Sequence, residues 1–230
     1  MTDDELRKLL SERIASVEVR VTAACQRAGR PRDSVTIVAI TKTVSVRVAA
    51  LLPELGLPNL GENRPQELWK KAAAIPGAIW HVTGHLQRNK IEQTLPLISM
   101  MHTLDSFRLA KSIDDFNASI PILLEMNCSR ESTKGGFAPE DLRVIGDTLM
   151  PLEGLMIAGL MTMAAHSDDP EVCRSTFVEL RNLKDRLERI MQRELPELSM
   201  GMTNDFEIAI EEGATFIRLG TVLFQGLEAE

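Results

Sequence analysis

The chain has 230 residues, which suits one large α/β domain or two small ones, and its hydrophobic content of 44% is ample for a core. A net charge of −7 without a long basic cluster argues against nonspecific nucleic-acid binding. The first residues are charged, and the most apolar stretch, residues 151–165, is shorter than a membrane span, so we expect neither a secretory signal nor a membrane helix.

The three cysteines, Cys25, Cys128 and Cys173, lie far apart and form no CxxC pair. Such spacing is typical of ordinary thiols in a reducing compartment. We therefore expect a cytoplasmic protein.

Apolar spacing of three and four residues predicts an amphipathic helix over residues 3–27, which a Gly-Arg-Pro string ends. A short, β-branched apolar run then predicts a buried strand over residues 35–40. Beyond it the two patterns alternate. Further helices are expected at residues 46–55, 65–74, 88–95, 106–117, 139–149 and 205–212 and on a long segment around residues 177–190. Further strand candidates are residues 78–82, 97–104, 120–126, 155–161, 198–200 and 215–219, and a short apolar turn at residues 57–60 completes the count.

Eight strand candidates that alternate with helices predict a single (β/α)8 TIM barrel with an additional N-terminal helix. A doubly wound open sheet is the alternative. Because no glycine- or proline-rich linker, repeat or low-complexity segment interrupts the pattern, we expect one domain over residues 1–230.

Lys42 follows the first buried strand by two residues. The carboxyl ends of parallel strands are where α/β folds keep their chemistry, and an amine held against apolar walls there can attack an aldehyde. The alternative is a strand that ends and lets its lysine extend into water.

Familiar nucleotide and hydrolase motifs are absent from the sequence: there is no GxGxxG after a strand, no GxxxxGK[ST] and no GxSxG. His81, His85, His102 and His166 show no paired metal spacing, so no metal site is predicted. Each of these histidines is expected to make a structural hydrogen bond or to lie in an exposed loop.

Two segments near the end of the chain resemble an anion site. Residues 198–205 read as a strand end, a turn of small residues and a helix start that Thr203 or Asn204 can cap. Residues 217–221 place an arginine on the last strand and open the following loop with Gly-Thr. In a barrel the loops after strands seven and eight frequently hold phosphate, so the two segments and Lys42 would surround an aldehyde-bearing phosphate ester such as pyridoxal 5′-phosphate.

Six strings that follow one another along nearly the whole chain resemble the pyridoxal-phosphate homeostasis protein family, whose barrel is similar to the N-terminal domain of alanine racemase. The strings are AITKT (39–43), LGEN (60–63), WHVTGHLQRNK (80–90), GLMT (159–162), LSMGMT (198–203) and IRLGT (217–221). Together they are highly specific, although each alone is not.

The resemblance implies a protein of vitamin B6 homeostasis that holds pyridoxal 5′-phosphate as a lysine aldimine and has no established catalytic turnover. Lys42 would form the Schiff base, Asn63 would lie beside the ring, and Arg218 would face the pyridine nitrogen and discourage its protonation. The residues expected around the phosphate are Ser199, Gly201, Gly220 and Thr221. Apoenzymes that require the cofactor are the possible partners, and a monomer or weak dimer is expected.

The chain departs from the family pattern in two places. The family commonly ends its last motif with Phe-Gly-x-Arg, whereas residues 223–228 read LFQGLE, which lacks the arginine and displaces the glycine by one position. This change concerns the C-terminal cap of the site. Thr41 stands where serine is usual and keeps the hydroxyl.

The alternative to a binding protein is an amino-acid racemase-like enzyme. Racemisation of the alanine racemase type needs a lysine on one face of the cofactor and a tyrosine on the other, and this sequence contains no tyrosine. The chain is also expected to be too short for the second domain of that enzyme, and His166 is the loop candidate for a substitute base. A regulatory scaffold that binds other enzymes is a third possibility.

Overall fold

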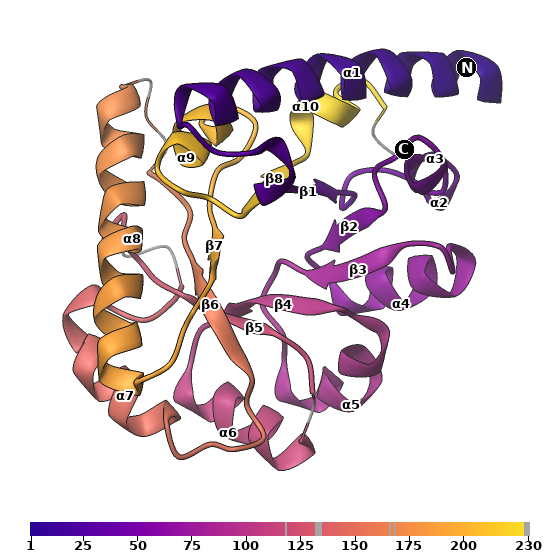
Figure 1. The fold of residues 1–230 in the computed structure, drawn as a ribbon. Coiled ribbons are helices and arrows are strands. Elements are labelled where there is room, and N and C mark those ends of the chain that lie inside the picture. The colour runs from indigo at the N-terminus through magenta and orange to yellow at the C-terminus, as the bar shows by residue number, and fades with distance from the viewer. Residues whose placement is uncertain (118, 132–134, 166, 168, 228–230) are drawn as a thin grey trace.

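Eight parallel strands close into a barrel in which each strand pairs with the next and β8 pairs with β1 (Figure 1). The computed structural model describes residues 1–117, 119–131, 135–165, 167 and 169–227. The strands are β1 (Thr36–Ile40), β2 (Asn59–Glu62), β3 (Ile79–Val82), β4 (Met100–Leu104), β5 (Ile122–Glu125), β6 (Ile157–Met161), β7 (Glu197–Ser199) and β8 (Phe216–Leu219). The predicted (β/α)8 barrel is thus confirmed, and the open sheet is wrong.

Helices surround the barrel. The helix α1 packs beside α9 and α10, at the top of the view (Figure 1). The α-helices are α1 (Asp3–Arg27), α2 (Val46–Ala49), α3 (Leu51–Glu54), α4 (Pro65–Ala74), α5 (Ile91–Thr94), α6 (Phe107–Phe116), α7 (Leu142–Leu149), α8 (Pro170–Met191), α9 (Phe206–Glu211) and α10 (Thr221–Phe224). Short 3-10 turns are η1 (Arg32–Ser34), η2 (Arg88–Lys90), η3 (Leu95–Leu97) and η4 (Pro139–Asp141). Within the described ranges, no helix is both long and apolar enough to cross a membrane.

Two of the predicted helices are divided in the structure. The segment expected as one helix over residues 46–55 forms α2 and α3, because Pro53 has no N–H to donate to the carbonyl of Ala49. The helix expected over residues 88–95 forms η2, α5 and the first residue of η3, and Pro96 follows it. The helix α10, directly after β8, was not predicted.

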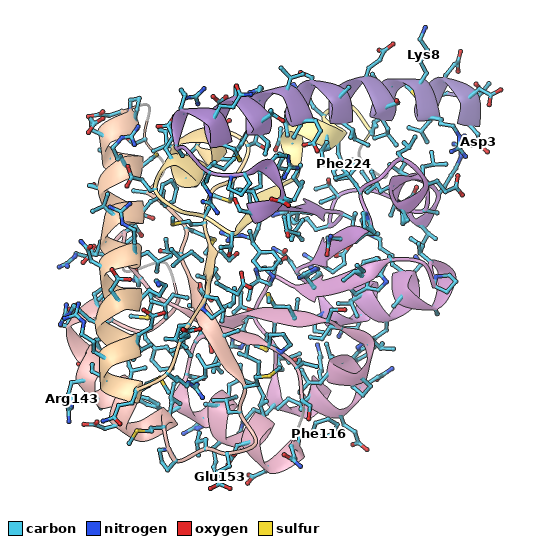
Figure 2. All side chains as sticks on the ribbon, in the orientation of Figure 1. Asp3, Lys8, Phe116, Arg143, Glu153 and Phe224 are labelled. Atoms are coloured by element: carbon cyan, nitrogen blue, oxygen red, sulfur yellow. The ribbon has the colours of Figure 1, made fainter. Side chains whose placement is uncertain are left out.

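The N-terminal helix α1 is amphipathic and buries Leu6, Leu10, Val17 and Val21 against the barrel's outer helices. Its N-terminus carries a full capping box between Thr2 and Glu5. Charged side chains on the outer helices, such as Lys8 and Arg143, project away from the core (Figure 2).

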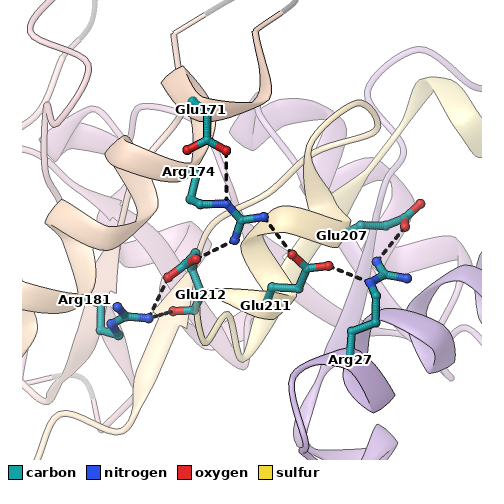
Figure 3. Close-up of polar contacts among 7 residues, drawn as sticks. All are labelled: Arg27, Glu171, Arg174, Arg181, Glu207, Glu211 and Glu212. Atoms are coloured by element: carbon teal, nitrogen blue, oxygen red, sulfur yellow. Dashed lines mark hydrogen bonds and ion pairs between the residues drawn. The ribbon is translucent and has the colours of Figure 1, made fainter.

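An ion-pair network joins α1, α8 and α9 (Figure 3). Arg174 of α8 contacts Glu212 at 2.6 Å through one terminal nitrogen and Glu211 of α9 at 2.8 Å through the other. Glu211 also accepts from Arg27 of α1 at 2.7 Å, and Glu212 accepts from Arg181 at 2.7 Å. The network fixes α9, and with it the loop after β7, against two long helices.

We predict that Arg174→Ala lowers the free energy of unfolding by about 1–2 kcal/mol, because it removes charge-assisted hydrogen bonds to two partly buried carboxylates. The matched control is Arg143→Ala, which breaks only an exposed pair with Asp147 and should cost at most about 0.5 kcal/mol. Urea unfolding measures both, and equal effects would contradict a cooperative network.

Candidate functional site

A cavity of about 670 Å³ opens at the carboxyl ends of the strands, where the loops after β1, β2, β6, β7 and β8 meet. Five of the seven residues predicted for the site line it: Lys42, Asn63, Arg218, Gly220 and Thr221. The wall also carries apolar side chains, among them Ile40 and Met163, and the acidic residues Glu131 and Asp205. The barrel therefore brings together residues from opposite ends of the sequence.

Lys42 lies just beyond β1, with its side chain exposed at the cavity. Its strand is the one that closes the barrel, and the register of β1 against β8 pairs Val38 with Arg218 and Ala39 with Leu219. Lys42 and the Gly220–Thr221 turn therefore follow neighbouring strands on the same rim.

Arg218 is buried, yet it reaches the cavity wall. Its Nη1 donates to the hydroxyl of Ser199 at 2.7 Å, and its Nη2 donates to the carbonyl of Thr162 at 3.0 Å. Burial lowers the pKa of the Arg218 guanidinium to about 10, while Asp205 and Glu125 act in the opposite direction. The group therefore stays a cation at neutral pH and keeps further N–H donors for a ligand.

Ser199 and Gly201 lie behind the cavity, and among the described residues the wall includes neither. The Ser199 side chain is 0% exposed, and its hydroxyl contacts both Arg218 and, at 2.8 Å, His102 Nδ1. Gly201 has a φ of +93°, and a Cβ there would lie 2.6 Å from the Cβ of Ala209. Close packing of the loop on α9 therefore accounts for this glycine.

Thr203 lines the cavity, a position that the predicted site did not include. Its hydroxyl accepts a hydrogen bond from the backbone N–H of Val222 at 3.3 Å, so it joins the loop after β7 to the first turn of α10. The prediction that Thr203 or Asn204 caps the next helix is wrong: α9 begins at Phe206 after Asp205. The sequence signal that could have identified Thr203 as a cavity residue was its place in the LSMGMT string.

A buried ion pair lies directly under the Lys42 turn. Lys71 Nζ of α4 contacts Glu62 Oε1 at 2.5 Å and donates to the carbonyl of Thr41 at 2.7 Å. The Thr41 hydroxyl donates to the same Glu62 oxygen at 2.7 Å. The side chains of Lys71 and Glu62 are 2% and 1% exposed. Sequence reasoning missed this pair, although Lys71 stands three residues after the buried Leu68 on the inner face of its helix.

Two histidines are buried inside the barrel, as the expectation of structural hydrogen bonds predicted. His81 Nδ1 lies 3.0 Å from His102 Nε2, and His81 Nε2 lies 3.0 Å from Asn59 Oδ1. His85 is exposed and pairs with Asp105. His166, the proposed substitute base, lies outside the described residues. Within the described part of the chain, no cluster of histidine, cysteine and carboxylate side chains could hold a metal ion.

The family model "Alanine racemase, N-terminal domain" matches residues 15–228. The pyridoxal phosphate homeostasis protein of Aquifex aeolicus is 40% identical over 219 residues, which are 93% of this chain and 96% of that protein. The chain belongs to the pyridoxal phosphate homeostasis protein family.

Solved structures agree with this family assignment. PipY of Synechococcus elongatus, determined with PLP bound, is 31% identical with a TM-score of 0.80 and covers 94% of this chain and 99% of its own. A protein from Bifidobacterium adolescentis is 33% identical with a TM-score of 0.90, and the match covers 97% of this chain and 98% of that one.

We predict that Lys71→Met, which leaves the buried Glu62 of the family's LGEN string without its cation, lowers the free energy of unfolding by about 3–5 kcal/mol. The matched control is Lys70→Met, the same change on the exposed side of the same helix, which should cost at most about 0.5 kcal/mol. Urea titration of both variants checks this, and a small loss in Lys71→Met would contradict a structural role for the pair.

The buried histidines predict a dependence of stability on pH. Burial lowers the pKa of His81 from 6.5 to about 4, and burial with the charges of His81 and Arg218 holds the pKa of His102 well below its usual range. The unfolded chain then binds more protons between about pH 6.5 and 4, so stability falls as pH decreases through this window.

We expect His81 alone to account for about 3 kcal/mol of that loss. The stability advantage of the wild type over His81→Gln should therefore narrow as urea titrations move from pH 7 toward pH 4. An advantage that stays constant with pH would show that His81 is not buried in its neutral form.

Proposed function

We propose that this chain binds pyridoxal 5′-phosphate reversibly through Lys42 and serves vitamin B6 homeostasis without catalytic turnover. One observation carries the proposal: an amine, a buried arginine and the Gly220–Thr221 turn line a single cavity. The names of the related proteins and the PLP-bound structure of PipY support the same ligand. When bound, the cofactor supplies an aldehyde that bonds reversibly to an amine, together with an anionic phosphate.

Each cavity residue suits one portion of this ligand. Lys42 offers the amine for the aldehyde, and Asn63, held by a 2.9 Å hydrogen bond from Thr83, lies at the edge where the ring would rest. Arg218 offers N–H groups to the pyridine nitrogen, and because it is a cation it opposes protonation there. Gly220, Thr221 and Thr203 offer hydroxyls and close backbone approach to phosphate, while Gly201 packs the loop after β7 on α9 behind them.

Gly220 provides a test of fit that does not depend on the relatives. Its φ of −119° lies outside the left-handed region, and the protein atoms nearest to an added Cβ would be those of Ile40 at 3.7 Å, an ordinary contact. Neither backbone strain nor protein packing therefore requires a glycine here. A ligand that approaches the backbone closely, as a phosphate does, would require one.

Binding is preferred to racemase chemistry because the sequence contains no tyrosine to act as the second base. We propose that the chain works in the cytoplasm, as its widely spaced cysteines suggest, as a monomer or weak dimer. Apoenzymes that require the cofactor are the partners that this role implies.

The direct test adds the cofactor to the purified protein, reduces it with borohydride and maps the labelled peptide. We expect one pyridoxyl group on Lys42 and none in Lys42→Ala. A label on another lysine, or no label at all, would refute the proposal. Incubation of the loaded protein with L-amino acids is the second arm, and turnover that Lys42→Ala abolishes would favour the enzyme.

We predict that Gly220→Ala retains wild-type stability within about 0.5 kcal/mol but raises the dissociation constant for pyridoxal 5′-phosphate by about tenfold or more, since the new methyl group would occupy ligand space. Gly201→Ala is the matched comparison and should destabilise the fold, because its Cβ would collide with α9. Absorbance titration and urea unfolding separate the two effects. Unchanged binding in Gly220→Ala would remove this turn from the site.

A further inference from the structure

A continuous line of hydrogen bonds crosses the barrel interior and ends at the cavity. It runs from Asn59 through His81, His102 and Ser199 to Arg218, and we call these five residues the buried polar chain. They come from β2, β3, β4, β7 and β8. Asn59, at the start of β2, is partly exposed, whereas the other four are buried. The buried polar chain therefore connects the amino-terminal rim of the barrel with Arg218 at the opposite rim.

The arginine sets the direction of every hydrogen bond in the buried polar chain. A guanidinium can only donate, so the Ser199 oxygen accepts from Arg218 and its own hydrogen is directed to His102 Nδ1. His102 then carries its proton on Nε2 and donates to His81 Nδ1. His81 in turn donates from Nε2 to Asn59 Oδ1.

The reverse order satisfies fewer groups. If His102 carried its proton on Nδ1, the Ser199 oxygen would accept twice, and its hydrogen would have no partner among the described residues although the side chain is fully buried. Unpartnered buried donors cost free energy, so the order that starts at Arg218 is favoured. Both histidines are then neutral Nε2–H tautomers, which agrees with the lowered pKa of each.

The buried polar chain is not suited to carry protons to the cavity. Its last member, Arg218, stays protonated and has no lone pair that could accept a proton. Its use is geometric: Ser199 and the Thr162 carbonyl hold both terminal nitrogens of Arg218, so the plane of the guanidinium is fixed and its remaining N–H groups have a set direction.

We propose that Ser199 and His102 are positioning residues for Arg218, and that His81 and Asn59 hold His102 in the tautomer that this task requires. The proposal rests on the proposed function, because the group that Arg218 meets in the cavity is the pyridine nitrogen. It assigns the serine of the LSMGMT string to the ring end of the ligand, through Arg218, and not to the phosphate.

The first test needs no cofactor. Nitrogen NMR of the imidazole rings distinguishes the two tautomers, and with four histidines in the sequence each signal can be assigned by substitution. We expect Nε2–H tautomers for His81 and His102 at pH 7. An Nδ1–H tautomer at His102 would overturn the proposal, because Ser199 could not then accept from Arg218 and donate to His102.

The second test compares Ser199→Ala, His102→Leu and the double variant, loaded with cofactor labelled at the ring nitrogen. Each single variant should move the ring-nitrogen chemical shift and speed cofactor dissociation by about fivefold to tenfold. The double variant should be no worse than the stronger single one, because both changes act through Arg218. Thr94→Val, which removes a fully buried hydroxyl that bonds to Trp69 and Lys90, is the control and should change neither readout.

Borohydride labelling of Lys42 separates a failure of the proposed function from a failure of the positioning role. An unlabelled wild type would refute the proposed function itself. Full labelling of Ser199→Ala with an unchanged ring shift and dissociation rate would refute only the positioning role. Circular dichroism establishes that each variant is folded, and Ser199→Ala, the smallest change, decides the outcome if His102→Leu does not fold.

Discussion

Closure of the barrel by β1 and β8 is the constraint on which the site depends. Four successive residue pairs, from Thr36 with Phe216 to Ala39 with Leu219, set this register. It places the amine of Lys42 and the Gly220–Thr221 turn after neighbouring strands, although they are far apart in the sequence. A shift of one residue would turn the side chain of Arg218 away from the barrel interior, because successive side chains on a strand point to opposite faces.

Buried polar groups then support two parts of the cavity wall from behind. The Lys71–Glu62 pair holds the Thr41 carbonyl under the Lys42 turn, and the buried polar chain holds Arg218. Each arrangement is costly to bury unless its hydrogen bonds are made, so each side chain is confined to a narrow range of positions. In the proposed function, a rigid cation at the ring end and an exposed amine at the aldehyde end would suit reversible holding better than proton transfer.

Much of this could be read from the sequence, because local patterns determine it. Alternating apolar runs and helical spacing predicted the barrel. The position of Lys42 at the end of the first strand predicted that it lies at the rim of the barrel. The partners of Ser199 could not be predicted, since His102 and Arg218 meet it only through the inward faces of three strands. Lys71 was missed for the same reason: a lysine on an apolar helix face finds its carboxylate only in the folded chain. Thr203 was expected to cap a helix, but its hydroxyl accepts from the backbone N–H of Val222 in α10.

A crystal structure of this chain soaked with pyridoxal 5′-phosphate would test the central claim most directly. The account predicts electron density continuous with Lys42 Nζ, the phosphate against Gly220 and Thr221, and the pyridine nitrogen within hydrogen-bond distance of Arg218, whose contact with Ser199 is kept. Density that leaves Lys42 unmodified, or a ring nitrogen turned away from Arg218, would contradict it.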